Sequence, residues 1–267
     1  MSGDECAVQM ICWAIAAFTW LPWLWESVAC ARLGSRSRHR WSLYAYPLVC
    51  VAVLAAVLRL YASADVRESS TYILFYLAMG MAWVGLSARY FLPYFGLSSR
   101  DDVVERRNPA AAHAIGGALL GVTLCFAGGN IGDGPGWWVV VFSAALSTVA
   151  FFLLWALLDR FTRLADAVTV ERDPASGIRL AGYFLGSGLI LGRAVAGDWM
   201  SANETVADFG KLAWPVLLLW LAAVLLELTF RPTKETPLPS PVTHGLAPLG
   251  AYVALALFFL AQAGWWS

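Results

Sequence analysis

The sequence predicts an all-α protein that crosses a membrane about eight times, and its charge, its hydropathy and its apolar runs all indicate this class. Only 13 % of the 267 residues are charged, which is about half the share of an ordinary soluble domain. Hydrophobic residues make up 60 % of the chain, and the mean hydropathy is +0.64. Such a surface requires lipid as its solvent, so we expect a polytopic protein whose main partner is the lipid bilayer.

The charge balance excludes one class of partner. The chain has 18 basic and 18 acidic residues and no long basic run. Binding to nucleic-acid phosphates requires a basic face. We therefore expect no nucleic-acid partner.

Eight segments are predicted to span the membrane. A helix needs about 20 apolar residues to cross a bilayer core, and six uncharged runs approach or exceed this length. Two further spans are interrupted by charge: one near 174–197 contains Arg179 and Arg193, and one near 210–230 contains Lys211 and Glu227. The six uncharged runs are 6–25, 41–58, 69–88, 108–132, 134–158 and 236–267.

The basic residues predict the orientation of these spans. Lys and Arg are retained on the cytoplasmic side, and they gather in every second loop. We therefore expect a bacterial inner-membrane protein with both termini on the extracytoplasmic side. The basic residues of these loops are Arg32, Arg36, Arg38, Arg40, Arg100, Arg106, Arg107, Arg160, Arg163, Arg172, Arg231 and Lys234.

An internal repeat appears when the chain is shifted against itself by 65 residues. A charged linker that ends in Arg-(Asn/Asp)-Pro-Ala and a following glycine pair recur in the same order. This predicts four segments: an N-terminal hairpin (1–66), repeat 1 (67–133), repeat 2 (134–200) and a C-terminal hairpin (201–267). The repeated residues are Arg107, Asn108, Pro109, Gly117 and Gly121 in the first copy, and Arg172, Asp173, Pro174, Gly182 and Gly186 in the second.

Each repeated motif has a structural role that its residue types predict. Asn or Asp before Pro is a helix-start signal, with the polar side chain as N-cap and Pro at the first helical position. Two glycines four residues apart lie on one helix face and let another helix approach closely. Because each copy holds two spans, both copies have the same orientation, as in repeats related by an axis along the membrane normal.

These residues resemble a known family. The segment 70–197 is similar to the bacterial inner-membrane family Domain of Unknown Function 350 in its tandem repeat and in two motifs of its first copy, 107–112 and 116–121. It departs from the family at Arg107, where Gly is frequent, at Pro109 and Pro174, and at Arg193. Both flanking hairpins lie outside this resemblance. The resemblance implies a protein without a settled activity that is associated with envelope stress and polyamine-linked gene neighbourhoods.

Ionisable residues inside the predicted spans are the candidate functional residues, because each is costly in lipid. They fall toward the cytoplasmic half, except Arg193. One interpretation is a polar vestibule in which Arg89 or Arg179 pairs with Glu26 or Glu227. The alternative is that Asp159, Arg179 and Arg193 reach the membrane interfaces with their polar ends. The candidate polar cluster is Glu26, Arg89, His113, Arg179 and Glu227.

The sequence contains no recognisable catalytic or cofactor constellation. His113 is the only histidine in a predicted span, whereas a bis-histidine haem needs two and a zinc site needs three or four ligands. The glycine-rich turn 128–136 lacks the nucleotide-binding pattern and is interpreted as a flexible connection. We therefore expect no cofactor, no metal and no enzymatic activity.

Three functional classes stay open. The first is a non-catalytic membrane scaffold or envelope-stress component that assembles as a homo-oligomer or with a membrane partner protein. The second is a channel or transporter for ions or small solutes. The third is an intramembrane enzyme, for which the sequence offers no recognisable constellation.

Overall fold

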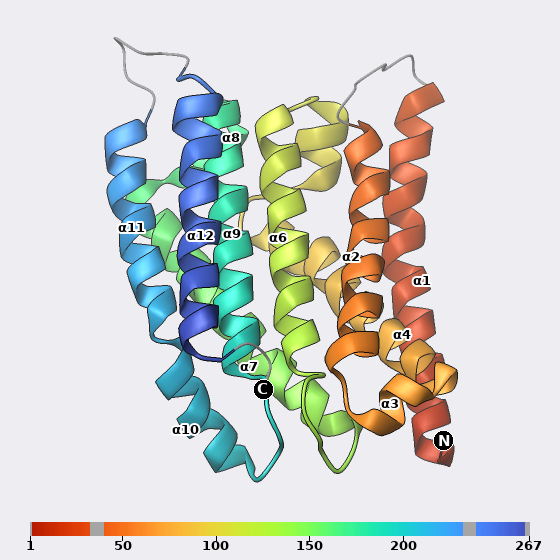
Figure 1. Ribbon diagram of the computed structural model, residues 1–267. Helices are drawn as coiled ribbons and strands as arrows, with labels where there is room; N and C mark the ends of the chain where they lie inside the picture. Colours follow the sequence, from red (N-terminus) through yellow and green to blue (C-terminus); the bar gives the residue numbers. More distant parts are fainter. Residues whose placement is uncertain (1, 33–39, 232–238, 265–267) are drawn as a thin grey trace.

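The computed structural model describes residues 2–32, 40–231 and 239–264, and almost all of its ordered elements are helices (Figure 1). In the part of the chain that it describes there is no strand, only one isolated bridge between Ala62 and Gly132. The predicted all-α class is confirmed. The elements are α1 (Gly3–Arg32), α2 (Arg40–Tyr61), α3 (Ala64–Glu68), α4 (Ser70–Leu86), η1 (Ser87–Phe91), α5 (Leu92–Tyr94), η2 (Ser99–Glu105), α6 (Pro109–Gly128), α7 (Trp137–Thr162), α8 (Leu164–Thr169), α9 (Pro174–Ala194), α10 (Ala202–Ala213), α11 (Pro215–Phe230), η3 (Val242–Leu246) and α12 (Ala247–Gln262).

The number of apolar spans is close to the predicted eight. Among the described residues, six helices are long and apolar enough to cross a membrane, and α10 with α11, bent by 43°, can form a seventh span. The remaining predicted span corresponds to α9. This helix has 21 residues, but its two arginines and five glycines lower its hydropathy. This helix is instead buried between α6 and α12.

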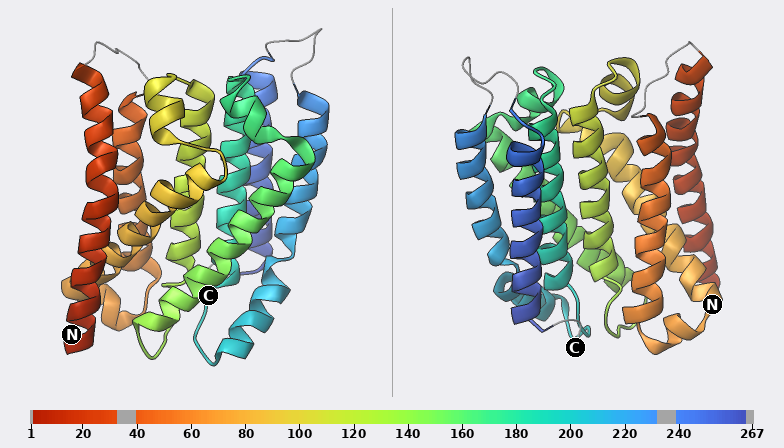
Figure 2. Two further views of the ribbon diagram at one scale, coloured as in Figure 1. Left: turned by 180° about the vertical axis from the view of Figure 1, so that it is seen from behind. Right: turned by 45° about the horizontal axis from the view of Figure 1, so that its top comes forward.

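The helices form two layers. In Figure 1, α2, α6, α9 and α12 stand side by side in one row, with α1 and α11 at its two ends. The rear view in Figure 2 shows α4 and α7 together on the opposite face of this row, both inclined in the same direction. The pair α6 and α9 has the most extensive contact in the molecule and forms its centre.

The direction of the helices agrees with an even number of spans. Helix α1 begins at the same end of the row at which α12 ends (Figure 1). Helices α6 and α9 begin at the opposite end, where the described basic residues Arg107, Arg172 and Arg231 also lie. Of the basic residues that predicted the orientation, Arg36, Arg38 and Lys234 lie outside the described residues.

The predicted helix starts of α6 and α9 are confirmed. The side chain of Asn108 accepts hydrogen bonds from the backbone N–H groups of Ala110 and Ala111, and that of Asp173 accepts from Ala175 and Ser176. Pro109 and Pro174 occupy the first helical position, where a missing N–H is not needed. Both caps follow an arginine in the left-handed region, with φ of 55° at Arg107 and 58° at Arg172.

The two predicted glycine pairs face different neighbours. Gly117 and Gly121 of α6 turn toward α9, and a Cβ added at Gly121 would lie 2.7 Å from the carbonyl oxygen of Phe184. Gly182 and Gly186 of α9 turn instead toward α12 and α11. The contact of α9 with α6 uses other glycines, which the repeat motif did not single out: Gly177, Gly188 and Gly192.

This difference defines how the repeats are related. A two-fold axis would bring the same face of both copies together, as in an isologous interface. Here the face of α6 that carries Gly117 and Gly121 packs on the side of α9 opposite to Gly182 and Gly186. The face of α9 that carries Gly182 and Gly186 packs on α12. The copies are parallel, as expected, but one copy is related to the other by a translation along the row of helices. This translation also explains why α4 and α7 lie on one face of the row (Figure 2).

Candidate functional site

One buried ion pair joins the second repeat to the C-terminal hairpin. Nε and Nη2 of Arg179 on α9 donate to the two carboxylate oxygens of Glu227 on α11, each over 2.7 Å. Nη1 donates to the carbonyl oxygen of His244, over 2.6 Å. The side chains of Arg179 and Glu227 are 0 % and 5 % exposed. Such a fork-to-fork pair is among the strongest polar contacts that side chains make.

The ion pair continues into the cap of α9. Nη2 of Arg179 also donates to the hydroxyl of Ser176, and that hydroxyl donates to the carboxylate of Asp173 over 2.6 Å. Asp173 is therefore both the N-cap of α9 and the end of a buried network that reaches α11. All three nitrogen atoms of the Arg179 guanidinium donate to protein oxygens. The side chain therefore holds α9, α11 and the residues before α12 together.

A second ion pair joins the first hairpin to the first repeat. Nη1 of Arg89, on η1, donates to Glu26 of α1 over 3.0 Å. The two side chains are 39 % and 19 % exposed, so this pair is far more open than the first. The π-helical turn at Ser87–Phe91 carries Arg89 and contacts α1.

The five residues of the predicted polar cluster do not form one site. The structure pairs Arg89 with Glu26 and Arg179 with Glu227, and the partner helices α1 and α11 stand at opposite ends of the row (Figure 1). His113 is an exposed residue of α6 and belongs to neither pair. The predicted pairing of these arginines with these glutamates is therefore found, but as two separate pairs, because residues at one membrane depth can lie on helices that are far apart laterally.

The remaining ionisable residues of the spans bind backbone groups. Asp159 accepts a hydrogen bond from the backbone N–H of Ala165 over 2.7 Å. Arg193 donates to the carbonyl oxygens of Ala263 and Gly264, beyond the end of α12. Both residues therefore secure helix ends.

The polar cap residues and prolines of the repeat motif have structural roles. Asn108 is fully buried, caps α6 and donates from Nδ2 to the carbonyl oxygen of Val168 over 2.7 Å. Arg107 and Arg172 are exposed, and Pro109 and Pro174 start their helices.

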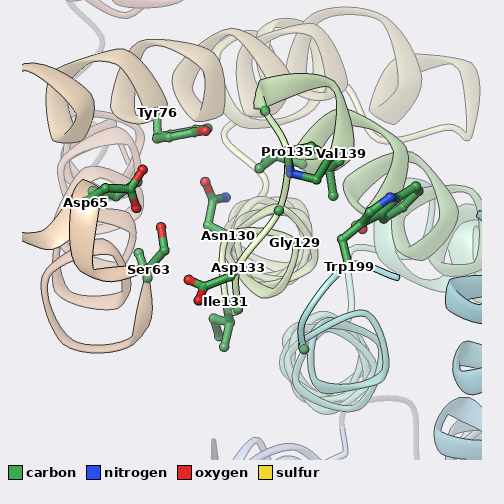
Figure 3. A pocket seen from close by; sticks show the side chains of 18 of the residues that line it. Ser63, Asp65, Tyr76, Gly129, Asn130, Ile131, Asp133, Pro135, Val139 and Trp199 are labelled. Atoms are coloured by element: carbon green, nitrogen blue, oxygen red, sulfur yellow. The ribbon is translucent and has the colours of Figure 1, made fainter. Parts of the chain in front are cut away.

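A polar cavity of about 180 Å³ lies at the other end of the molecule, where α6 ends (Figure 3). Residues of the α2–α3 connection, of α3, of α4 and of the turn 128–136 line it, among them Ser63, Asp65, Tyr76, Asn130 and Asp133. Sequence reasoning missed this cavity. The available signal was Asn130, a polar residue directly after an apolar helix and three residues before Asp133.

The glycine-rich turn beside this cavity is held by hydrogen bonds to the segment 197–199. The N–H groups of Gly197 and Trp199 donate to the carbonyl oxygens of Ile131 and Asp133, over 2.9 and 2.8 Å. The N–H of Asp133 donates to the carboxylate of Asp198 over 2.8 Å. The structure thus contradicts the flexible connection expected from the sequence, because partners 65 or 66 residues away hold the turn.

The comparison with protein families identifies the second half of the chain. Residues 134–263 match the family described as Domain of Unknown Function (DUF350). No curated protein and no solved structure matches the chain. The match begins before α7 and includes α11 and α12, so the C-terminal hairpin belongs to the family segment, whereas the resemblance seen in the sequence had been placed at 70–197. The family that matches is therefore the one that the sequence resembled, and in this multi-pass membrane protein the match runs from the residues before α7 to the end of α12.

Proposed function

We propose that this protein is a non-catalytic scaffold of the bacterial inner membrane, with both termini on the extracytoplasmic side. The observation that carries the proposal is that charged side chains inside the spans bind other groups of the protein. Arg179 and Glu227 bind each other, and Arg193 binds backbone carbonyls. A transport path needs polar groups that can exchange partners with a solute. Saturated groups serve instead to hold helices in one arrangement.

The packing of the central helices supports the same conclusion. Glycines bring the backbones of α6 and α9 into contact at Gly117, Gly177 and Gly188. Small residues at such contacts are what holds helices together in lipid, where no hydrophobic drive exists. A row joined in this way is suited to present fixed surfaces to other proteins and not to open a path between its helices.

The first experiment is a flux assay on purified protein in liposomes, with ions and small neutral solutes. We expect no flux above that of empty liposomes. The oligomeric state is measured in the same preparation by native mass spectrometry, with a homo-oligomer or a stoichiometric membrane partner expected. Solute flux, or a monomer that never associates in the membrane, contradicts the scaffold.

The envelope-stress association that the family resemblance implies is part of this proposal. A deletion strain is expected to be more sensitive to agents that damage the cell envelope, and the full chain is expected to restore resistance. Equal sensitivity of deletion and parent strains argues against that role.

The exposed pair of Arg89 and Glu26 favours a second candidate, a channel or transporter for ions or small solutes. Arg89 lies within the span Ser70–Tyr94 and is 39 % exposed, so it is more open to a passing solute than the buried Arg179. This candidate requires flux that Glu26→Gln and Arg89→Ala change. The control is Glu105→Gln, which alters an exposed ion pair outside the spans.

A further inference from the structure

The cavity at the end of α6 is unusual in the oxygen atoms that it gathers. Figure 3 shows the side chains of Ser63, Asp65, Tyr76 and Asn130 directed toward a common space, with Asp133 below them. They come from three separate parts of the chain: the region after α2, the helix α4 and the turn after α6. None of the described residues that line the cavity is Lys, Arg or His.

Asn130 is the centre of this arrangement. It is 6 % exposed, and its Nδ2 donates to the carbonyl oxygen of Phe126 over 2.8 Å. This bond fixes which end of the amide is the oxygen. Within the described residues, Oδ1 has no hydrogen-bond partner, and Figure 3 shows the amide directed into the cavity. A buried acceptor without a partner is rare in folded proteins and calls for an explanation.

The charge around this oxygen is negative. Asp65 and Asp133 line the cavity, and Glu5 of α1 lies at its edge. Helix α6 ends beside it at Gly128, so the partial negative charge of the helix C-terminus adds to that of the carboxylates. A cation, and not an anion or a neutral apolar group, is the ligand that such a cavity accepts.

We propose that this cavity binds a hard divalent cation of the calcium class, with Oδ1 of Asn130 and the carboxylate of Asp65 as protein ligands. Calcium accepts carboxylate, amide and water oxygens in flexible geometry, whereas magnesium requires a nearly ideal octahedron. The described part of the chain has no group of three His, Cys, Asp or Glu side chains that could hold a metal. The ligand set is therefore mixed, water completes it, and the affinity is in the range of about 0.1 to 1 mM that extracellular calcium modules show.

The binding would join two parts of the molecule that are far apart in the chain. Asp65 belongs to α3, in the first hairpin, and Asn130 to the turn that connects the two repeats. The bridge between Ala62 and Gly132 already brings these segments together. A cation at this place secures the first hairpin against the repeat unit, which is a property that the scaffold proposal does not require.

The second copy of the repeat provides an internal comparison. The position 65 residues after Asn130 is Val195, which has no amide oxygen. Val195 also lines the cavity. The cavity therefore contains both Asn130, with its unpartnered amide oxygen, and the apolar residue that occupies the same position in the second copy. The proposal therefore assigns one cation to each chain. The substitution Asn130→Val gives the first copy the valine that the second copy has at this position.

The experiment uses the full chain in detergent, stripped with EDTA and titrated with calcium chloride at constant ionic strength. Thermal unfolding and equilibrium binding of calcium are measured, because a ligand that binds only the folded state raises its melting temperature. We expect one calcium ion per chain and a rise of a few degrees at 10 mM. Asp65→Asn and Asn130→Val are expected to weaken calcium binding at least tenfold.

The controls separate a ligand from a structural role. Glu68→Gln removes an exposed carboxylate from the same helix α3, outside the cavity, and should leave calcium binding unchanged. In EDTA, Asp65→Asn should unfold at the temperature of the parent protein. A parent without a calcium response overturns the proposal, as does an equal response to sodium or magnesium at the same ionic strength. An equal loss in Glu68→Gln and Asp65→Asn also overturns it.

Discussion

Arg179 and Glu227 meet through two parallel hydrogen bonds of 2.7 Å in a place where neither side chain is more than 5 % exposed. The pair connects the central helix α9 to α11, and Ser176 and the carbonyl oxygen of His244 accept two further hydrogen bonds from the guanidinium. Its strength depends on both partners being present. Removing one leaves an uncompensated charge in a low-dielectric interior.

Glu227→Ala should therefore destabilise the folded protein by about 3–5 kcal/mol. The double change of Arg179→Met with Glu227→Leu should recover most of that loss, because it removes both charges and preserves volume. Thermal unfolding in one detergent measures all three proteins. A double variant as unstable as Glu227→Ala would show that the charges themselves are needed.

Gly117→Ala should destabilise the contact of α6 with α9. Its added Cβ meets the backbone of Ala181, which cannot move aside as a flexible side chain can. We expect a loss of about 1–3 kcal/mol from overpacking, measured as a lower unfolding temperature.

The matched control for Gly117→Ala is Gly250→Ala, in α12. There an added Cβ meets nothing within 4 Å. Because Ala has the higher helix propensity, this variant should be as stable as the parent or more so. A similar loss in both variants would indicate that the glycines matter for helix flexibility and not for close packing.

Asn108→Ala should cost more than an ordinary cap. It removes two accepted hydrogen bonds at the start of α6 and the bond from Nδ2 to the carbonyl oxygen of Val168. Loss of a cap costs about 1 kcal/mol, and the unpartnered carbonyl adds about 1–3 kcal/mol. Asn108→Asp keeps the cap alone and should be intermediate in an unfolding experiment. Equal effects of the two changes would mean that Val168 gains another partner.

Arg107→Gly and Arg172→Gly should each stabilise the protein by about 1 kcal/mol. Both arginines are exposed and have φ values of 55° and 58°, a conformation that costs a residue with a Cβ about 1–2 kcal/mol. Arg106→Gly is the comparison, because Arg106 has a φ of −84°; it should destabilise the protein, since it gains nothing from glycine and loses its ion pair with Asp102. Destabilisation by Arg107→Gly would assign its guanidinium a role on the basic face of the molecule.

The local parts of this fold could be predicted because they depend on residues close in the chain. Apolar runs located the spans, and Asn108-Pro109 and Asp173-Pro174 located the starts of α6 and α9 within one residue. The span count differs only at α9, because its hydropathy is low and its burial against other helices is not visible from composition.

The candidate site could be predicted only in part. The sequence placed Glu26, Arg89, Arg179 and Glu227 at similar depth and allowed either glutamate for either arginine. The structure separates them into two pairs, since lateral distance between helices leaves no trace in hydropathy. Asn130 was not singled out, because its significance depends on α3 and α4, which the fold brings beside it.

The chain itself therefore specifies the membrane class, the helix starts and the 65-residue repeat, since burial in lipid and capping are set by neighbouring residues. Which glycine face meets which helix, which charges pair, and which oxygens surround the cavity follow from the sideways stacking of the repeats. Equivalent residues of the two copies face different neighbours in such a stack, so their roles arise from the assembled helices and not from the motif they share.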